Sequence, residues 1–297
     1  MNSGPGSETF GLPVNEAVAF STPKGKVKES IKKNQLRMLE KYAAILRQFL
    51  EPGEEILLVM RGCSPMSLLE QLTTGWIIVH IKRCAFVVTN RRILHFPAQS
   101  NYAPRHSISQ IRYGDVDAIK ASAFLGRKFS VSYKDGSKET FYYVQESRKL
   151  KAILDGFRIA GEQPSPVRAR HHLCPKCTAP LSTGTYTCSK CGLEFKSEKK
   201  ARVLSILLPG GGYFYTGHPF LGISDAIGET ILLALVASSL YGILFGTSDP
   251  AGKIMVFFVF SLLFAVEKLI TIYHARHYVR EYIPVDKDFH PINGLEK

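Results

Sequence analysis

The chain has 297 residues, of which 45% are hydrophobic, and it carries a net charge of +13. A chain of this length holds about two domains, and six cysteines are too few for a small secreted disulfide scaffold. Residues 203–297 hold six basic and eight acidic residues, so the positive excess lies entirely before them. This asymmetry predicts an anionic partner, either lipid headgroups or nucleic acid, for the first two thirds of the chain.

The first 51 residues divide into two segments. Residues 1–27 are rich in Gly, Ser, Pro and charged residues and contain no apolar run, so we expect a disordered lead-in and no signal peptide. Residues 28–51 place apolar side chains at helical spacing with Lys and Arg between them, and Pro52-Gly53 ends the pattern. Such a basic amphipathic helix packs on the next domain, lies on a membrane surface or self-associates.

Residues 52–160 change to short β-rich runs separated by turn residues. Asp135-Gly136 is a strong hairpin signal. The apolar positions of the last run follow helical spacing, so a helix is expected to close this domain. The predicted strands cover residues 54–61, 84–89, 92–96, 116–121, 128–133 and 140–144, and the predicted helix covers residues 146–160.

Two motifs in this domain resemble a known family. The run Phe86–Leu94 (FVVTNRRIL) resembles the VTNRRIL signature of bacterial pleckstrin-homology-like (GRAM-like) domains, and Ile108–Val116 resembles their I-x-x-I-x-Y-x-D-I segment. The resemblance covers roughly residues 50–160. It implies a half-open barrel of seven strands closed by a C-terminal helix, with a binding or assembly role toward lipid, peptide or a second copy. A lipid or partner contact would then involve three basic residues, which could equally be ordinary solvated charges: Arg91, Arg92 and Arg112.

An apolar insertion at residues 65–81 (PMSLLEQLTTGWIIVHI) departs from that family pattern. It contains Trp76, the only tryptophan of the chain. The insertion is short for a membrane span, and Glu70 and His80 also argue against one. It either completes the barrel as a loop or helix, or it enters the membrane interface, where Trp is favoured.

Two C-x-x-C pairs follow a linker at residues 161–173. Each pair forms a tight turn that directs both sulfurs to one point, and two such turns supply the four thiolates of a tetrahedral structural Zn²⁺ site. The spacing resembles the short zinc ribbons of bacterial proteins, and we assign this ribbon to residues 174–195. The expected ligands are Cys174, Cys177, Cys188 and Cys191.

The expected zinc site has four protein ligands and no open position, so we expect a structural and not a catalytic metal. Zinc ribbons often bind nucleic acid, and this ribbon is basic. Its position beside a membrane segment instead favours a spacer or a platform that docks a partner.

Residues 203–275 form the predicted membrane domain. The segments 226–245 and 254–273 are each long and apolar enough to span a bilayer, and the polar run 246–253 joins them into a hairpin. Basic residues gather before the first span and after the second, so the positive-inside rule places both ends, including the tail at 276–297, in the cytoplasm. We therefore expect an integral protein of a bacterial inner membrane with its soluble parts in the cytoplasm.

The start of the membrane domain carries a glycine-rich motif. The run Pro209–Gly222 resembles the P-G-x-G-x-F-Y-x-G signature of a small bacterial membrane domain built as a helical hairpin. Glycines allow close helix packing in lipid, but three in a row make a continuous span doubtful. We predict a re-entrant or interfacial element over residues 203–222; if it spanned, the zinc ribbon and the C-terminus would lie on opposite sides.

Two charges lie inside the predicted spans at matching depth. Glu229 and Lys268 are each about twenty residues from the centre of the hairpin turn, so they should face each other on opposing helices. We predict an intramembrane ion pair between them. The alternative is that both side chains extend to the interface.

The predicted fold class is multidomain α+β with membrane helices: a pleckstrin-like half-open barrel, a zinc ribbon and a transmembrane hairpin. No nucleophile–base pair, phosphate loop or paired-carboxylate motif stands out, so we expect no enzyme. The sequence predicts a cytoplasm-facing, membrane-anchored adaptor or scaffold that binds anionic lipid or a protein partner, or that self-associates. The alternative is a non-catalytic subunit of a larger membrane complex.

Overall fold

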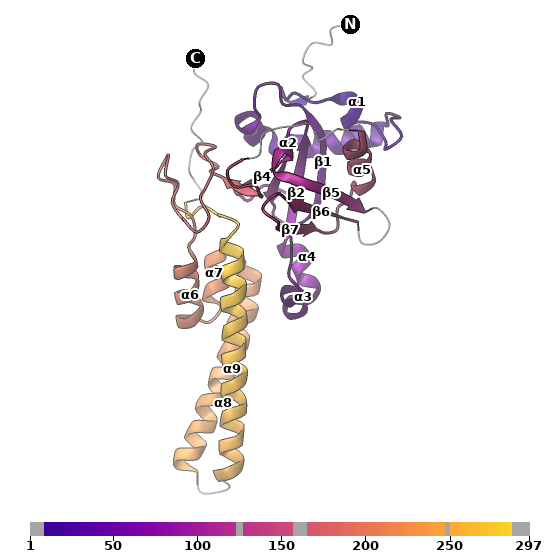
Figure 1. The fold of residues 1–297 in the computed structure, drawn as a ribbon. Coiled ribbons are helices and arrows are strands. Elements are labelled where there is room, and N and C mark those ends of the chain that lie inside the picture. The colour runs from indigo at the N-terminus through magenta and orange to yellow at the C-terminus, as the bar shows by residue number, and fades with distance from the viewer. Residues whose placement is uncertain (1–8, 123–126, 157–164, 247–249, 287–297) are drawn as a thin grey trace. The chain divides into compact units, whose positions relative to one another are not determined.

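The computed structural model describes residues 9–122, 127–156, 165–246 and 250–286. The chain forms two compact units (Figure 1). The first, called the sheet unit here, comprises Met1–Leu193 with Asp286–Lys297, and the second, the hairpin unit, comprises Glu194–Val285. The fold is mixed, with antiparallel sheets in one unit and long helices in the other.

Two antiparallel sheets form the centre of the sheet unit. Their strand orders are β1-β2-β3-β4-β8 and β5-β6-β7. An isolated bridge between Cys63 and Tyr142 joins the end of β1 to the chain just after β7, so the two sheets meet on one side. The strands are β1 (Ile56–Cys63), β2 (Arg83–Thr89), β3 (Arg92–Pro97), β4 (Ile108–Arg112), β5 (Val116–Ser122), β6 (Lys128–Tyr133), β7 (Lys138–Phe141) and β8 (His171–Leu173).

The predicted hairpin at Asp135-Gly136 is confirmed. Gly136 adopts φ +87°, a conformation that side-chain-bearing residues avoid. The Asp135 carboxylate accepts hydrogen bonds from the backbone N–H and the hydroxyl of Ser137, which shape the turn between β6 and β7. Helix α5 (Ser147–Gly156) then follows, so seven consecutive strands and a closing helix have the order that the family resemblance implied.

The first sheet is buried on both faces, so nearly every residue of β2 and β3 is buried, including Arg92 and His95. One face packs against the second sheet in a core that contains Leu58, Phe86 and Phe129. The other face packs against α2 (Glu29–Phe49), whose Tyr42 and Leu46 lie in a second core. The amphipathic helix is therefore a packed element of the sheet unit.

Two corrections concern the ends of the sheet unit. The predicted disordered lead-in is wrong from residue 9 onward, because Leu12 is buried under α2, Val14 pairs with Ile56, and the short helix α1 (Glu16–Ala19) follows. Residues 1–8 lie outside the described part. The predicted linker 161–173 ends in β8, which pairs with β4.

The insertion between β1 and β2 is helical. It comprises α3 (Leu68–Thr74), a single 3₁₀ turn (Gly75–Ile77) and α4 (Ile78–Ile81). Ser67 caps α3 and forms a capping box with Glu70. A further 3₁₀ turn, Tyr113–Asp115, links β4 to β5.

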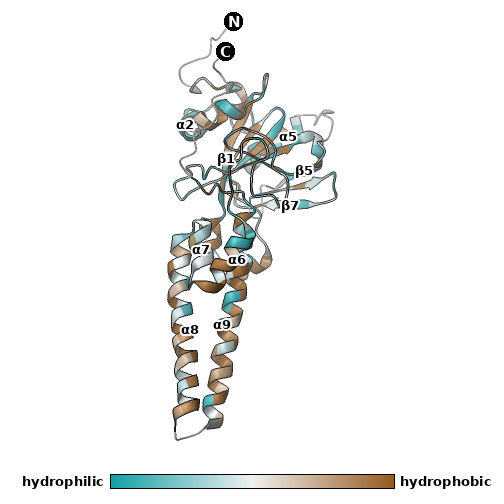
Figure 2. Ribbon diagram, turned by 90° about the vertical axis from the view of Figure 1, so that its left-hand side faces the viewer, coloured by the Kyte–Doolittle hydropathy of each residue, from teal (hydrophilic) through white to brown (hydrophobic). Residues whose placement is uncertain are grey.

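Within residues 194–246 and 250–285, the hairpin unit has four helices, two of them long, and Figure 1 shows their arrangement. The long helices pack on each other and are long and apolar enough to cross a membrane, and Figure 2 shows hydrophobic residues along most of both. The entry and exit of the unit meet, because Phe195 bridges to Pro284. The helices are α6 (Glu198–Leu207), α7 (Gly211–Thr216), α8 (Pro219–Phe245) and α9 (Pro250–Val279).

The glycine-rich motif forms the turn between α6 and α7. Gly210 has φ +67°, and a Cβ atom there would lie 2.1 Å from the carbonyl oxygen of Gly222. A Cβ atom on Gly212 would lie 2.0 Å from Ser205 Oγ and 3.0 Å from the Ala275 methyl group. The missing side chains therefore let the turn pack tightly against α8 and α9, and α6 and α7 return to the side from which the chain enters.

Candidate functional site

The four paired cysteines lie together. Their sulfurs all lie within 4.8 Å of one another. The Sγ atoms of Cys174 and Cys191 are 3.5 Å apart, and those of Cys177 and Cys188 are 3.6 Å apart. A tetrahedral ion with metal–sulfur bonds near 2.3 Å requires sulfur–sulfur separations of about 3.8 Å. The cluster is therefore suited to hold a metal ion.

Each C-x-x-C turn supplies backbone hydrogen bonds around its first sulfur. The backbone N–H groups of Lys176 and Cys177 face the Cys174 sulfur, and those of Lys190 and Cys191 face the Cys188 sulfur. Gly192 adopts φ +72° after the second turn. These donors favour negatively charged thiolates, which are the form that binds a metal.

The thiols of the cluster differ in acidity. Burial raises the pKa of Cys174 and of Cys177 above the ordinary value. Burial also acts to raise the pKa of Cys188, but the backbone N–H groups of Cys191 and Lys190 outweigh it and hold this pKa at about 7. A bound dication stabilises thiolates further, so the donor set fits a structural Zn²⁺ held by four sulfurs.

The structure brings Glu229 and Lys268 together. Lys268 Nζ lies 2.7 Å from Glu229 Oε2 and also donates to the backbone oxygen of Ser205 at 2.8 Å. The backbone N–H of Gly210 donates to the same Glu229 oxygen at 3.1 Å. The turn between α6 and α7 therefore covers the pair and leaves Glu229 only 1% exposed.

Two further carboxylates adjoin this pair. One oxygen each of Asp225, Glu229 and Glu267 lies within 4.8 Å of the others, and Thr271 donates to Asp225 at 3.1 Å. Sequence reasoning missed the contribution of Asp225. Its spacing of four residues from Glu229 on one helix, matched by Glu267 and Thr271 on the other, is the signal that could have revealed it.

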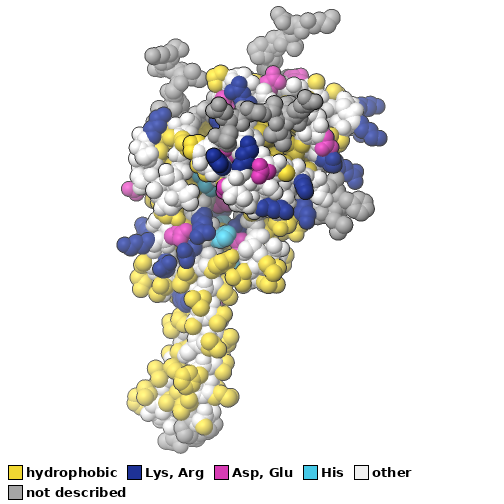
Figure 3. Space-filling model, viewed as in Figure 1, with side chains coloured by type: hydrophobic (Ala, Val, Ile, Leu, Met, Phe, Trp, Pro, Cys, Tyr) yellow, Lys and Arg dark blue, Asp and Glu magenta, His cyan; other side chains and the backbone are white. Residues whose placement is uncertain are grey.

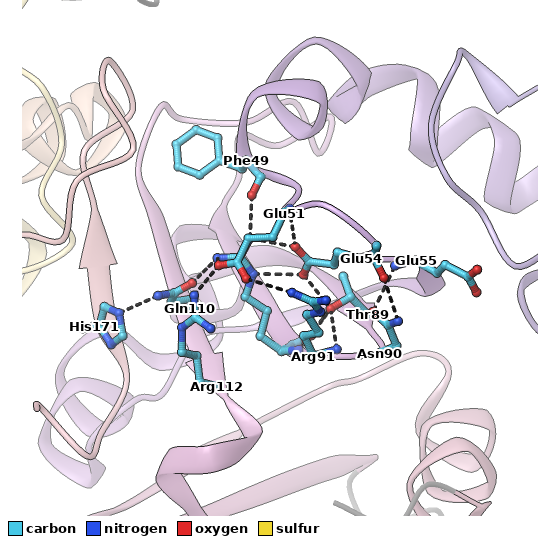
Figure 4. A network of polar contacts seen from close by, with 12 residues as sticks. Phe49, Glu51, Glu54, Glu55, Thr89, Asn90, Arg91, Gln110, Arg112 and His171 are labelled. Carbon is cyan, nitrogen blue, oxygen red and sulfur yellow. Dashed lines mark hydrogen bonds and ion pairs between the residues drawn. The ribbon is translucent and has the colours of Figure 1, made fainter. Parts of the chain in front are cut away.

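The three arginines expected to bind lipid or a partner lie against glutamates, and Figure 4 shows Arg91 and Arg112 beside Glu51. Arg92 is only 3% exposed, and it donates to Glu54 at 2.9 and 2.8 Å and to the backbone oxygen of Phe49 at 2.5 Å. Arg112 pairs with Glu51, and the more exposed Arg91 lies 3.6 Å from the same residue. The expectation of a binding role is corrected for Arg92, because its guanidinium is enclosed and its charge is neutralised.

Glu54 is held as a carboxylate by this network. Burial acts to raise its pKa, but the hydrogen bond and the charge of Arg92, together with the Thr89 hydroxyl, outweigh burial and lower the pKa below its ordinary value. The VTNRR motif therefore has a structural role inside the sheet unit. Thr89 and Arg92 both donate to Glu54, and Arg92 also donates to Phe49 O at the end of α2.

Trp76, the fourth residue expected to bind lipid or a partner, lies on the surface of the helical insertion and is 75% exposed. Leu68 and Leu72 of α3 are exposed to a similar extent. Beneath them Lys82 Nζ pairs with Glu70 Oε1 at 2.8 Å, and both side chains are buried. The insertion thus exposes four large apolar side chains, Leu68, Leu69, Leu72 and Trp76, beside the exposed polar residues Gln71, Thr73 and His80.

Helix α2 exposes a basic face that sequence reasoning did not single out as a site. Lys33, Arg37 and Lys41 follow one another at spacings of four residues and are all exposed. Arg37 donates to the Asn34 side chain and Lys41 to the backbone oxygen of Asn101, both neutral groups. Exposed Lys24, Lys26 and Lys28 precede the helix and extend this basic segment.

A buried histidine, His95, makes hydrogen bonds inside the sheet unit. His95 lies between the hydroxyls of Ser64 and Ser109, each at 2.9 Å. Burial lowers its pKa well below the ordinary value, so the ring is neutral at physiological pH. The triad is fully buried, and it holds β3 to β4 and to the end of β1 without access for a substrate.

The comparisons with known proteins return little. No protein-family model matches the chain, and no curated protein matches its sequence. A solved structure described as the Vps36 N-terminal PH domain matches at 16% identity and a TM-score of 0.24, over 36% of this chain and 86% of that one. A likeness of that size decides neither the fold nor the function of this chain.

Proposed function

We propose that the chain is a membrane-anchored adaptor: the hairpin unit fixes it in a bilayer, and a pleckstrin-like sheet unit presents a surface to an anionic partner. The observation that carries the proposal is the surface of α8 and α9. Large apolar side chains are exposed along both helices, including Ile227, Leu244, Phe258 and Leu269. Contact with the acyl chains of a bilayer favours such an apolar surface, whereas exposure to water is unfavourable.

The charges of the hairpin unit agree with this anchoring. Glu229 and Lys268 neutralise each other, as charged groups within lipid require. At the end where the chain enters and leaves, Arg276 and Arg280 both pair with Glu198, and Lys199, Lys200 and Arg202 are exposed. The opposite end carries Lys253, so the positive-inside rule places the sheet unit in the cytoplasm.

The four cysteines bind Zn²⁺ as a structural element in this proposal. Thiolates stay reduced in the cytoplasm, which agrees with the orientation of the hairpin. The ion ties residues 174–193 into a rigid connection that leads into α6. No step of catalysis is assigned to it, because all four ligand positions are taken by protein sulfurs.

The basic face of α2 supplies the recognition surface. Its apolar side is buried in the sheet unit, so its lysines and arginines are held in a fixed row and not on a mobile tail. A row of basic side chains with neutral contacts attracts acidic surfaces, whether lipid headgroups or an acidic protein segment.

Flotation of the fragment 1–193, loaded with Zn²⁺, tests this recognition surface. We expect it to float with vesicles that contain phosphatidylglycerol and not with vesicles of phosphatidylcholine alone, and to lose binding in high salt. The triple variant K33Q/R37Q/K41Q should lose most of the binding. The matched variant K128Q/K134Q/K138Q removes the same charge from the second sheet and should retain it.

Indifference to lipid charge, or equal loss in both triple variants, would contradict a specific basic surface. The chain would then be better explained as a non-catalytic subunit of a larger membrane complex, in which α8 and α9 bind other spans.

A further inference from the structure

We infer that the helical insertion α3–α4 enters the bilayer interface and orients the sheet unit on the membrane. The inference rests on the anchoring in the proposed function, because α8 and α9 are what hold the sheet unit near a bilayer. It goes beyond anchoring in assigning a second, separate membrane contact to residues 65–81.

The first observation is an apolar surface that the sheet unit does not cover. Leu68, Leu72 and Trp76 are 72%, 73% and 75% exposed, and Leu69 is 48% exposed. Figure 3 shows hydrophobic side chains gathered over α3. Scattered single apolar residues on a surface are ordinary, but four large ones on a nine-residue segment mark a contact site.

The second observation is that this surface is preformed and uncharged. The Ser67 hydroxyl accepts from Glu70 N at 3.0 Å, and Glu70 Oε2 accepts from Ser67 N at 2.8 Å. The remaining charge of Glu70 is balanced by Lys82 in the interior. Met66 and Ile78 of the insertion pack with Cys63, so the insertion is held against the end of β1. Glu70 is paired in the interior, while four large apolar side chains face outward.

Several features favour lipid over a protein as the occupant. A stable protein interface takes roughly 20–30 residues on each side, and this patch offers four large side chains. Trp is favoured at the membrane interface, and its ring here lies edge-on to His80, 5.5 Å between centroids. The segment is too short to span, so insertion stops at the interface. Tethering by α8 and α9 keeps the bilayer at high effective concentration, so a small apolar patch suffices.

The single tryptophan makes a direct test practical. The full chain is reconstituted into vesicles whose lipids carry bromine on the acyl chains, and Trp76 emission is compared with that in unbrominated lipid. We expect blue-shifted emission that brominated lipid quenches strongly. The variant L68S/L72S should shift the emission to the red and lose most of this quenching. The control V27S/V167S, which alters two exposed apolar residues elsewhere in the sheet unit, should behave like the parent chain.

Emission that stays red and is quenched by a water-soluble quencher would overturn the inference. Blue-shifted emission that brominated lipid does not quench would overturn it too, since a second copy or another protein would then cover Trp76. Flotation of the same vesicles reports anchoring independently: protein that floats while Trp76 remains in water leaves the proposed function standing, whereas protein that fails to float contradicts both.

Discussion

At the scale of single residues, the ion pair between Glu229 and Lys268 depends on its surroundings. The side chain of Glu229 is enclosed by α9 and by the turn between α6 and α7, and its second oxygen, Oε1, is buried without a hydrogen-bond partner among the described residues. Removing the lysine would leave a charge that neither water nor another cation reaches. Removing both charges would leave neither of these two positions with an unpaired charge, while Asp225 and Glu267 stay nearby.

Substitution of Lys268 tests this pair. We expect K268L to destabilise the hairpin unit by about 3 kcal/mol, because it leaves Glu229 buried and uncompensated. The double variant E229Q/K268L should recover most of the loss, since the glutamine carbonyl still accepts from Gly210. Thermal unfolding in detergent measures the effect, and K199Q provides an exposed-lysine control. Equal losses in the single and double variants would rule out the pair.

Adjacent Arg91 and Arg92 provide a second comparison at this scale. R92A should destabilise the sheet unit by about 3–5 kcal/mol by leaving Glu54 unpaired in the interior. R91A should cost less than about 1 kcal/mol, because Arg91 is 39% exposed and its contact with Glu51 is long. Denaturant unfolding followed by circular dichroism measures both.

The Arg92 variant should also change the pH dependence. The folded pKa of Glu54 lies below its ordinary 4.5, so its stabilising contribution is complete above pH 4.5 and declines as the pH falls through the folded pKa. In R92A the hydrogen bonds from Thr89 and from the backbone N–H of Glu51 remain, but the guanidinium is gone. Burial then acts more strongly on Glu54, and protonation of its carboxylate relieves part of the cost. The stability difference between R92A and the parent chain should therefore shrink on acidification below neutral pH; a constant difference would contradict this account.

At the scale of elements, the four-cysteine cluster is directly connected to β8. Leu173 pairs with Ile108, packs under α2 and directly precedes Cys174. The backbone N–H of Cys174 donates to Ala179 O, and that of Cys188 donates to Leu193 O, so each C-x-x-C turn closes a small loop. These loops are too small to form an apolar core, so a bound metal would supply much of the energy that orders them.

Metal removal tests this dependence. Purified protein should contain one Zn²⁺ per chain, and C174S should lose it, whereas C63S should keep it. Chelation should raise amide hydrogen exchange in residues 174–193 and in β8, because metal-linked folding is local. Exchange in β1–β3 should not change, since their cores lie elsewhere. Unchanged exchange in residues 174–193 after metal loss would show that the turns fold without it.

At the scale of the whole molecule, the two units differ in whether their apolar side chains are buried or exposed. The sheet unit covers its central sheet with α2 on one face and the second sheet on the other. The hairpin unit leaves the apolar surfaces of α8 and α9 exposed and encloses the ion pair of Glu229 and Lys268. Burial of apolar area stabilises the first unit in water, whereas the proposed bilayer would cover the exposed apolar surfaces of the second.

Several parts of this arrangement were predictable from local sequence. The C-x-x-C spacing indicated the four-sulfur cluster, and the Asp135-Gly136 signal indicated the β6–β7 hairpin. The length of two apolar segments indicated two helices able to span a membrane. The equal distances of Glu229 and Lys268 from the hairpin turn indicated that these residues face each other. Each of these rests on a short-range rule of spacing or turn geometry, so no distant contact was needed to infer it.

Other parts depended on contacts between distant segments. Leu12 joined the core and β8 joined the sheet because partners far along the chain were available, and neither segment has a pattern strong enough to show it. The role of Arg92 was mistaken for the same reason. An arginine in a motif reads as exposed unless the position of Glu54, 38 residues earlier, is known.

The amino-acid sequence alone thus determined which segments are apolar, basic or thiol-rich, because these properties belong to the side chains themselves. Tertiary structure decided which charges are neutralised and which faces are left uncovered. The charges of Arg92 and Lys82 are neutralised by Glu54 and Glu70, respectively. Trp76 and the α2 residues Lys33 and Lys41 stay exposed. Burial and neutralisation are properties of pairs of segments, and only folding establishes the pairs.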